Sequence, residues 1–287
     1  MKPLWLATIL CLSLFSSRAD QNKPTGTGDF FKGPLGIQMY SLRHISATNP
    51  IAALDKVREY GLHTIEGSSG RIPPQEYLQL LKDRNIRIVS TFADYARLKT
   101  NIESVIASAK QLGVKYVVCG WIPHEKGKFS KKNALDAVEL FNTVGERLKQ
   151  ADLVFAFHIH GYEFQPYTTG TMFDLMMRHT KPEFVSYELD VFWAAQGGAD
   201  PTALLEKYGS RFKLMHVKDL RKGAEINLTG SAPDSDSVPV GSGQINWPAV
   251  LKAAQAAHVE HYFIEDEAVD AVNQIPVTLR YLEQLKW

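Results

Sequence analysis

The feature that most constrains this chain is an alternation, repeated eight times, of a short apolar run with a longer amphipathic stretch. The runs are rich in β-branched and aromatic residues and have no polar face, which is typical of parallel strands covered on both sides. We expect strands at residues 35–42, 63–67, 86–92, 114–121, 153–160, 184–191, 211–219 and 261–267.

The stretches between these runs repeat apolar residues at spacings of three and four, as amphipathic helices do. We expect helices at 50–60, 74–84, 97–112, 131–150, 171–179, 201–208, 247–257 and 272–286. Asn49 and Pro50 open the first, because proline presets the first helical turn. Gly113 closes the third helix, and Asp200 followed by Pro201 opens the sixth.

Eight consecutive strand–helix units favour a closed (β/α)8 barrel, an α/β fold also called the TIM barrel, over an open doubly wound sheet. The chain has 287 residues, and no linker or change of composition divides it. Such barrels fold as one domain of about 250 residues. We therefore expect a single TIM-barrel catalytic domain at 34–287, preceded by a polar lead at 20–33.

One long irregular stretch, at about 220–246, is rich in Gly, Ser, Asp and Pro. A connection of this length inside a compact domain is usually functional or disordered. Since it follows the seventh strand, we expect it to lie over the mouth of the barrel; the alternative is an uninvolved surface loop.

The N-terminus has the layout of a secretory signal. Lys2 precedes an uncharged run at 4–15, and small residues stand at Ser17 and Ala19. The run is shorter than the roughly 20 residues of a membrane span. We expect a signal peptide at 1–19, cleaved near Ala19, and a secreted or periplasmic protein with no stable membrane anchor; a buried N-terminal helix is the alternative. Cleavage leaves Cys119 as the only cysteine, so no intramolecular disulfide can form.

The last four expected strands each end in ionisable residues, where barrel enzymes carry their catalytic groups. These ends hold His158, His160 and Glu163; Glu188 and Asp190; His216, Lys218 and Asp219; and Glu265, Asp266 and Glu267. Buried carboxylates and imidazoles are costly without a partner, and a divalent cation would compensate them together. Mixed carboxylate and imidazole ligands suit manganese, zinc, cobalt or magnesium.

These segments resemble the xylose isomerase-like barrels of the sugar phosphate isomerase/epimerase family, including a secreted branch that processes 3-keto-glycosides. The matching segments are HIHGYEF (158–164), LDVFWAAQGGADPTALLEKYGSRFKLMHVKD (189–219), PVGSGQINWPAVLKAA (239–254) and YFIEDE (262–267), with GIQMYSLR (36–43) fitting the first strand. The resemblance covers essentially the whole chain after the signal peptide.

Family members bind one divalent metal ion, commonly manganese, through residues of the last four strands. By position, the resemblance implies the ligands Glu163, Asp190, His216 and Glu265. In the fifth strand many relatives place the liganding glutamate where this chain has His158, so either His158 or Glu163 is the ligand there. The third strand ends in Thr91 and Phe92, where relatives often have a histidine.

The family's common reaction moves a proton on the carbon next to a carbonyl. The resemblance implies Glu163 and Glu265 as base and acid, with His158, His160 and Lys218 orienting hydroxyls or relaying protons. It also implies that Gln38, Trp121, Tyr162 and Trp193 contact the sugar; alternatively, Trp193 belongs to the core.

An exported protein should act on an unphosphorylated keto-sugar or keto-glycoside, because phosphorylated sugars are mainly cytoplasmic. Proton transfer then gives isomerisation, epimerisation or loss of the aglycone, as in a 3-keto-glycoside lyase. The alternatives are a non-catalytic sugar-binding barrel and an endonuclease-like phosphodiesterase. With 32 basic and 31 acidic residues, the chain gives no reason to expect nucleic acid as a partner. Related barrels are often dimers or tetramers, so a homo-oligomer is one possibility.

Overall fold

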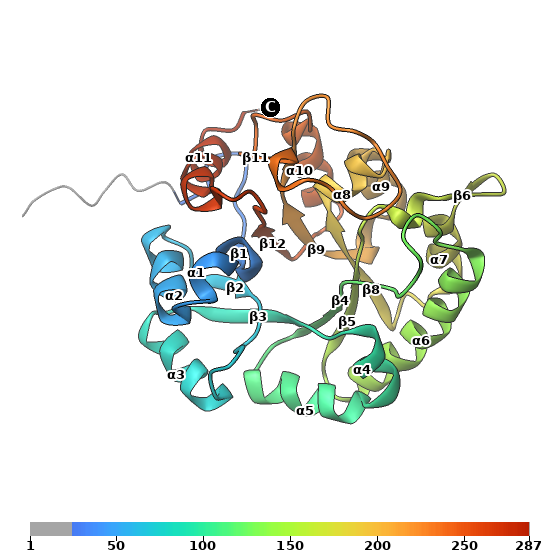
Figure 1. Ribbon diagram of the computed structural model, residues 1–287, viewed down its shortest axis with the longest axis horizontal. Coiled ribbons are helices and arrows are strands. Elements are labelled where there is room, and N and C mark those ends of the chain that lie inside the picture. The colour runs from blue at the N-terminus through green and yellow to red at the C-terminus, as the bar shows by residue number, and fades with distance from the viewer. Residues whose placement is uncertain (1–24, 287) are drawn as a thin grey trace, which may run out of the picture.

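The computed structural model describes residues 25–286, which form a closed parallel barrel surrounded by helices (Figure 1). The barrel strands are β1 (Leu35–Gln38), β2 (Thr64–Glu66), β3 (Arg87–Phe92), β4 (Tyr116–Cys119), β5 (Val154–His158), β8 (Val185–Asp190), β9 (Phe212–Val217) and β12 (His261–Ile264). Neighbours follow in chain order, and β12 closes the barrel by pairing with β1. The predicted eight-stranded TIM barrel is confirmed.

The helices occupy most of the expected ranges. They are α1 (Arg43–Ser46), α2 (Pro50–Glu59), α3 (Pro74–Asp83), α4 (Tyr95–Thr100), α5 (Ile102–Leu112), α6 (Lys131–Gln150), α7 (Met172–His179), α8 (Val191–Gln196), α9 (Pro201–Tyr208), α10 (Trp247–Ala256) and α11 (Ala271–Glu283). The predicted boundaries are confirmed at Asn49, whose side chain accepts from the Ala52 N–H, and at Gly113, which is left-handed with φ 67°.

The expected helix at 97–112 is wrong in one respect, because it is two helices that meet at Asn101. The backbone of Asn101 leaves the helical region with φ −153° and ψ 60°. Its side chain accepts a hydrogen bond from the Ser104 N–H at 3.2 Å and so caps α5. Short 3-10 turns are also present: η1 (Met39–Leu42), η2 (Tyr162–Phe164), η3 (Gly209–Arg211) and η4 (Asp234–Asp236).

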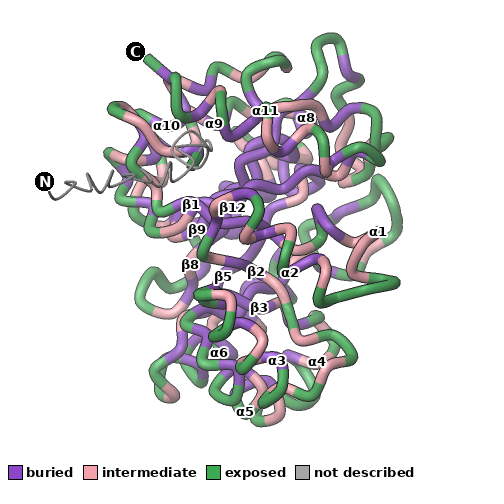
Figure 2. Tube along the Cα trace, turned by 90° about the vertical axis from the view of Figure 1, so that its left-hand side faces the viewer, coloured by how far each residue is buried: buried purple, intermediate pink, exposed green. Residues whose placement is uncertain are grey.

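Burial is concentrated on the strands at the centre, while the outer faces of the helices are exposed (Figure 2). The described part of the polar lead joins this core, since Phe31 is fully buried with its ring edge-on to Tyr262 at 5.1 Å. Cys119 is buried and free. Within 25–286, no helix is long and apolar enough to span a bilayer. The predicted signal peptide at 1–19 lies outside the described residues.

The long irregular stretch after β9 is an excursion held at its base. Its ends pair as the antiparallel strands β10 (Asp219–Leu220) and β11 (Ser237–Val238). The Asp219 carboxylate accepts backbone N–H groups of Gly241 at 2.8 Å, Gly243 at 3.1 Å and Ile245 at 3.3 Å. A second small hairpin, β6 (Pro166–Tyr167) with β7 (Gly170–Thr171), precedes α7.

A substitution at Gly145 tests how closely α6 packs on the barrel. A Cβ atom at Gly145 would lie 2.3 Å from the Phe184 carbonyl oxygen just before β8. Exchange of a helical glycine for alanine normally stabilises by about 0.5–1 kcal/mol. Here we expect Gly145→Ala to lower the free energy of unfolding by about 1–3 kcal/mol, measured by urea denaturation. The exposed neighbour Glu146→Ala should change it by less than about 0.5 kcal/mol, and a stabilised Gly145→Ala would contradict the close contact.

Candidate active site

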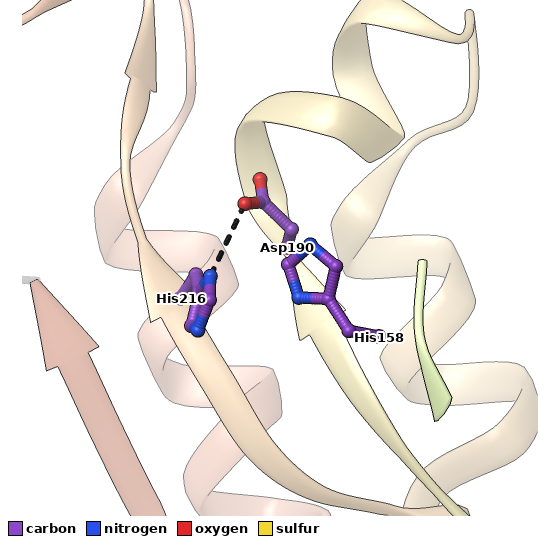
Figure 3. A group of neighbouring side chains, drawn as sticks. All are labelled: His158, Asp190 and His216. Carbon is purple, nitrogen blue, oxygen red and sulfur yellow. Dashed lines mark ion pairs between the residues drawn. The ribbon is translucent and has the colours of Figure 1, made fainter. Parts of the chain in front are cut away.

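Four ionisable side chains converge at the carboxyl ends of β5, β8, β9 and β12. His158 and Asp190 are the last residues of β5 and β8, His216 lies near the end of β9, and Glu265 follows β12. The Nδ1 atom of His216 is 3.4 Å from Asp190 Oδ2 and 3.3 Å from Glu265 Oε2. Figure 3 shows His158 turned toward the same point, and all four side chains are buried.

These residues could hold a metal ion. One donor atom from each of His158, Asp190 and His216 lies within 4.8 Å of the others. Ligands about 2.1 Å from a tetrahedral ion are roughly 3.4 Å apart, close to the spacings around His216. Asp190 Oδ1 accepts from the Trp193 N–H at 2.8 Å, whereas the buried Oδ2 accepts no hydrogen bond from residues 25–286. A buried carboxylate oxygen that lacks a hydrogen bond and lies near the ring nitrogens of His158 and His216 is a suitable ligand for a cation.

A second layer of carboxylates lies behind the two histidines. His216 Nε2 is 2.7 Å from Glu66 Oε1, and Glu188 Oε2 is 3.1 Å from His158 Nδ1. Carboxylates in this position orient metal-binding imidazoles and fix which ring nitrogen carries the proton. Glu66, Glu188 and His216 form another group that could hold an ion. The 2.7 Å contact of Glu66 with His216 Nε2 fits a hydrogen bond better than a shared ion, and neither glutamate lines the cavity described below.

Sequence reasoning missed Glu66. It is the last residue of β2 and is completely buried, with the Ser90 hydroxyl donating to its carboxylate. The rule that drew attention to polar residues at the ends of the last four strands would have found it at the second strand as well.

The charges in the group compensate one another. Burial and the neighbouring imidazoles lower the pKa of His158 well below its ordinary value, so this ring is neutral. Burial alone would raise the pKa of Glu265, but the Lys218 and His216 charges hold it well below its usual range. For His216, burial opposes protonation, yet Glu188 and Glu265 raise its pKa. A neutral imidazole and an ionised carboxylate are the forms that bind metals, so an ion bound here would have to displace the proton of His216.

Lys218 is buried behind the cavity wall. Its Nζ lies 3.2 Å from Glu265 Oε2 and 2.7 Å from Glu267 Oε1. The ammonium also sits over the rings of Phe192 and Trp193, at 4.6 and 4.9 Å from their centroids. Burial would lower the pKa of Lys218, but the carboxylates of Glu265 and Asp190 raise it, so the cation persists. Lys218 therefore acts on the site through the carboxylates it holds.

A cavity of about 350 Å³ opens over the group. Of the predicted site residues it is lined by Gln38, His158, His160, Trp193, His216 and Glu265, together with Glu267. Residues 230–232 of the excursion between β10 and β11 complete the wall, which confirms that this stretch lies at the barrel mouth. Trp193 thus lines the cavity while being only 4% exposed.

Glu163 lies elsewhere. It stands in η2, five residues beyond the end of β5, and its carboxylate accepts the His160 N–H at 3.1 and 3.2 Å. Among residues 25–286, it belongs to neither group that could hold an ion. Of the two alternatives for the fifth strand, the structure brings His158 to Asp190 and His216, because the turn at Gly161 folds Glu163 back on the backbone.

Trp121 and Tyr162 are also outside the lining of the cavity. Their rings pack edge-on with centroids 4.7 Å apart, and the Tyr162 hydroxyl accepts the Ile122 N–H at 2.9 Å. A Cβ atom on Gly230 would lie 2.7 Å from the Tyr162 ring. These aromatic residues therefore support the excursion that closes the cavity.

We expect Glu66→Gln to weaken binding of Mn²⁺ or Zn²⁺ by about 10–100-fold, because the carboxylate no longer orients His216. His158→Ala should weaken it further, and titration calorimetry measures both. Glu163→Gln, at an equally buried glutamate, should leave the affinity unchanged. A loss of binding in Glu163→Gln with normal binding in His158→Ala would reverse the assignment of the ligand from β5.

Glu163 should make stability depend on pH. Burial raises its pKa from 4.5 to about 8 in the folded protein. The folded state therefore favours the protonated form of Glu163. The stability that this preference contributes is fully present below pH 4.5 and is lost as the pH rises through about 8. Urea denaturation should show Glu163→Gln gaining stability relative to wild type between these limits, by up to about 1.4 kcal/mol per pH unit. A difference independent of pH would contradict the raised pKa.

Comparisons with known proteins agree with this architecture. The chain is 24% identical to a sugar phosphate isomerase/epimerase from Parabacteroides distasonis, with a TM-score of 0.71 over 87% of this chain and 93% of that one. A structure of the IolI protein with a bound zinc atom aligns at 16% identity and a TM-score of 0.66, over 86% of this chain and 95% of that one. These likenesses show the fold.

An inosose dehydratase from Clostridium tetani is 30% identical over 99 residues, which are 34% of this chain and 32% of that protein. The match thus spans about a third of that curated relative. The family described as xylose isomerase-like TIM barrel matches residues 54–285. Most of the barrel is included in that range, and the chain therefore belongs to the xylose isomerase-like TIM barrel family.

Proposed function

We propose that the protein is a metal-dependent enzyme that removes the proton next to the carbonyl of an unphosphorylated keto-sugar, and that with a 3-keto-glycoside it expels the aglycone. The observation that carries this proposal is the group of His158, Asp190, His216 and Glu265 around one point at the bottom of a polar cavity. A sugar-processing barrel family makes a carbohydrate the expected substrate.

These four residues would hold the ion. When bound, a divalent cation supplies positive charge that stabilises a negative oxygen on the carbon beside the one losing its proton. Manganese is the ion we favour, with zinc, cobalt and magnesium as alternatives.

Two carboxylates of the cavity can move protons. The contacts of Glu265 with His216 and Lys218 both use Oε2, which leaves Oε1 for the substrate. Glu267 lines the same cavity and is held by Lys218 at 2.7 Å, so it takes the place that the sequence analysis gave to Glu163. His160 also lines the cavity, and burial lowers its pKa to about 3. Its neutral ring can bind a sugar hydroxyl.

In the elimination, Glu265 takes the proton from the carbon next to the ketone. The electron pair of that C–H bond forms a carbon–carbon double bond to the neighbouring carbon. The bond from that carbon to the aglycone oxygen breaks, and Glu267 gives this oxygen a proton. The keto-sugar leaves as an unsaturated ketone, and no oxidant or reductant is needed.

The charge of the cavity supports an unphosphorylated substrate. Within the described chain, no lysine or arginine lines the cavity, whereas Glu265 and Glu267 do. A phosphate group would therefore meet carboxylates with no lysine or arginine side chain in the wall to pair with it. If the predicted signal peptide at 1–19 exports the protein, it would likewise meet unphosphorylated sugars, because phosphorylated sugars are mainly cytoplasmic.

Relatives with both kinds of name are found: one is the sugar phosphate isomerase/epimerase described above, and two others have names that indicate elimination. One is the inosose dehydratase, and the other is a probable 3-DHS dehydratase from Bacillus anthracis, 14% identical with a TM-score of 0.67 over 88% of this chain. A dehydratase removes water from its substrate. The proposed elimination also breaks a C–H bond and a C–O bond on neighbouring carbons, but the group that leaves is the aglycone.

Proton exchange tests the proposal. We expect the Mn²⁺-loaded protein, incubated in D2O with methyl 3-keto-β-glucoside, to place deuterium beside the ketone and to release methanol, followed by NMR. EDTA should stop both processes, and Glu265→Gln should slow exchange by about 100-fold or more. The exposed variant Glu146→Gln is the control.

The other outcomes separate the alternatives. A new diastereomer without methanol would show an epimerase. Bound metal without exchange on a panel of keto-sugars would overturn the enzyme assignment and favour the sugar-binding barrel.

A further inference from the structure

A second cavity of about 810 Å³ adjoins the one over the metal-binding group. The two share Gln38, Tyr40 and Phe92 in their walls. The second cavity extends away from the barrel axis between the segment after β1 and the segment after β2, with residues 38–54 on one side and 67–77 on the other. Together the two cavities exceed what a single sugar ring occupies.

The chemistry of the second cavity differs from that of the first. Among residues 25–286, its lining has neither histidine nor carboxylate, and its charged side chains are those of Arg43 and Arg71. Much of its wall is apolar, from the side chains of Met39, Leu54 and Tyr77 together with the rings of Tyr40 and Phe92. A wall of this kind binds a flat apolar group by removing its surface from water.

Tyr40 forms the junction between the cavities. The residue is 52% exposed, unusually high for a large aromatic side chain. Its N–H donates to the side-chain oxygen of Gln38 at 2.6 Å, and the Arg43 guanidinium stacks on its ring at 4.6 Å. Arg43 in turn donates to the Glu267 carbonyl oxygen at 2.6 Å. The exposed ring is therefore held in place between the second cavity and the catalytic carboxylates.

We propose that the second cavity is a subsite for a flat apolar aglycone, such as an aromatic ring, joined to the sugar that the first cavity binds. This inference rests on the proposed function in that it takes the first cavity as the sugar site. It identifies the substrate class as glycosides with aromatic aglycones, because a free monosaccharide would leave the larger, apolar cavity without a ligand.

Binding of unoxidised glycosides tests the subsite without any reaction. Phenyl β-glucoside should bind the full protein about tenfold or more tightly than methyl β-glucoside, measured by calorimetry. Ala47 is exposed and lines the second cavity, so the bulky ring of Ala47→Trp should narrow it and bring the ratio of the two Kd values closer to one. Ala96 is also exposed but lies on α4 outside both cavities, so Ala96→Trp should keep the ratio of the wild type.

Equal affinities for the two glucosides in the wild type would overturn the subsite, as would an unchanged ratio in Ala47→Trp. These results are independent of proton exchange. Tight binding of the phenyl glycoside without exchange on its 3-keto form would retain the subsite and reject the proposed chemistry, and exchange with equal affinities would do the reverse.

Discussion

The structure depends on the compensation of charge inside the barrel. Four of its ionisable side chains are completely buried, with no surface exposed to water: Glu66, Glu188, Asp190 and His216. Ionised groups in such surroundings cost several kcal/mol each unless partners surround them. His216 lies 2.7 Å from Glu66 and 3.4 Å from Asp190 and is the partner of both. Glu188 lies 3.1 Å from the His158 ring, and Lys218 in turn pairs with Glu265. These contacts offset the cost of burying charged groups, and they also orient the imidazoles of His158 and His216 toward the cavity.

The period of the apolar residues was enough to predict the barrel, because each strand is covered on both faces and each helix on one. It was not enough to predict the break at Asn101. Apolar residues continue at helical spacing through Leu98, Ile102 and Val105, so the pattern reads as one helix. The break comes from a single side chain that competes for the Ser104 N–H, and such local competition leaves the pattern of apolar residues unchanged.

For the site, the position of residues at strand ends carried most of the information. The predicted strand ends placed Asp190, His216 and Glu265 among a larger set of ionisable residues, and the family resemblance selected these three as ligands. Glu163 could not be placed in the same way, since it follows the strand by a turn whose direction depends on the left-handed Gly161. Trp121 was expected to face the sugar, but it lies outside the cavity, 39% exposed, with Gly230 of the excursion against its ring. The path of such a stretch is not encoded in a periodic pattern.

The excursion between β10 and β11 is attached in a way that allows the substrate specificity of the barrel to change. β10 pairs with β11, and one carboxylate, that of Asp219, gathers three amides beyond β11. The two ends are thus fixed beside each other whatever lies between them. Lengthening a closed loop costs little entropy once its ends are held, about 0.6 kcal/mol for each doubling. Residues 221–236 can therefore be exchanged for another loop, in evolution or in the laboratory. The wall of the cavity would then change while the metal-binding residues on the strands keep their positions.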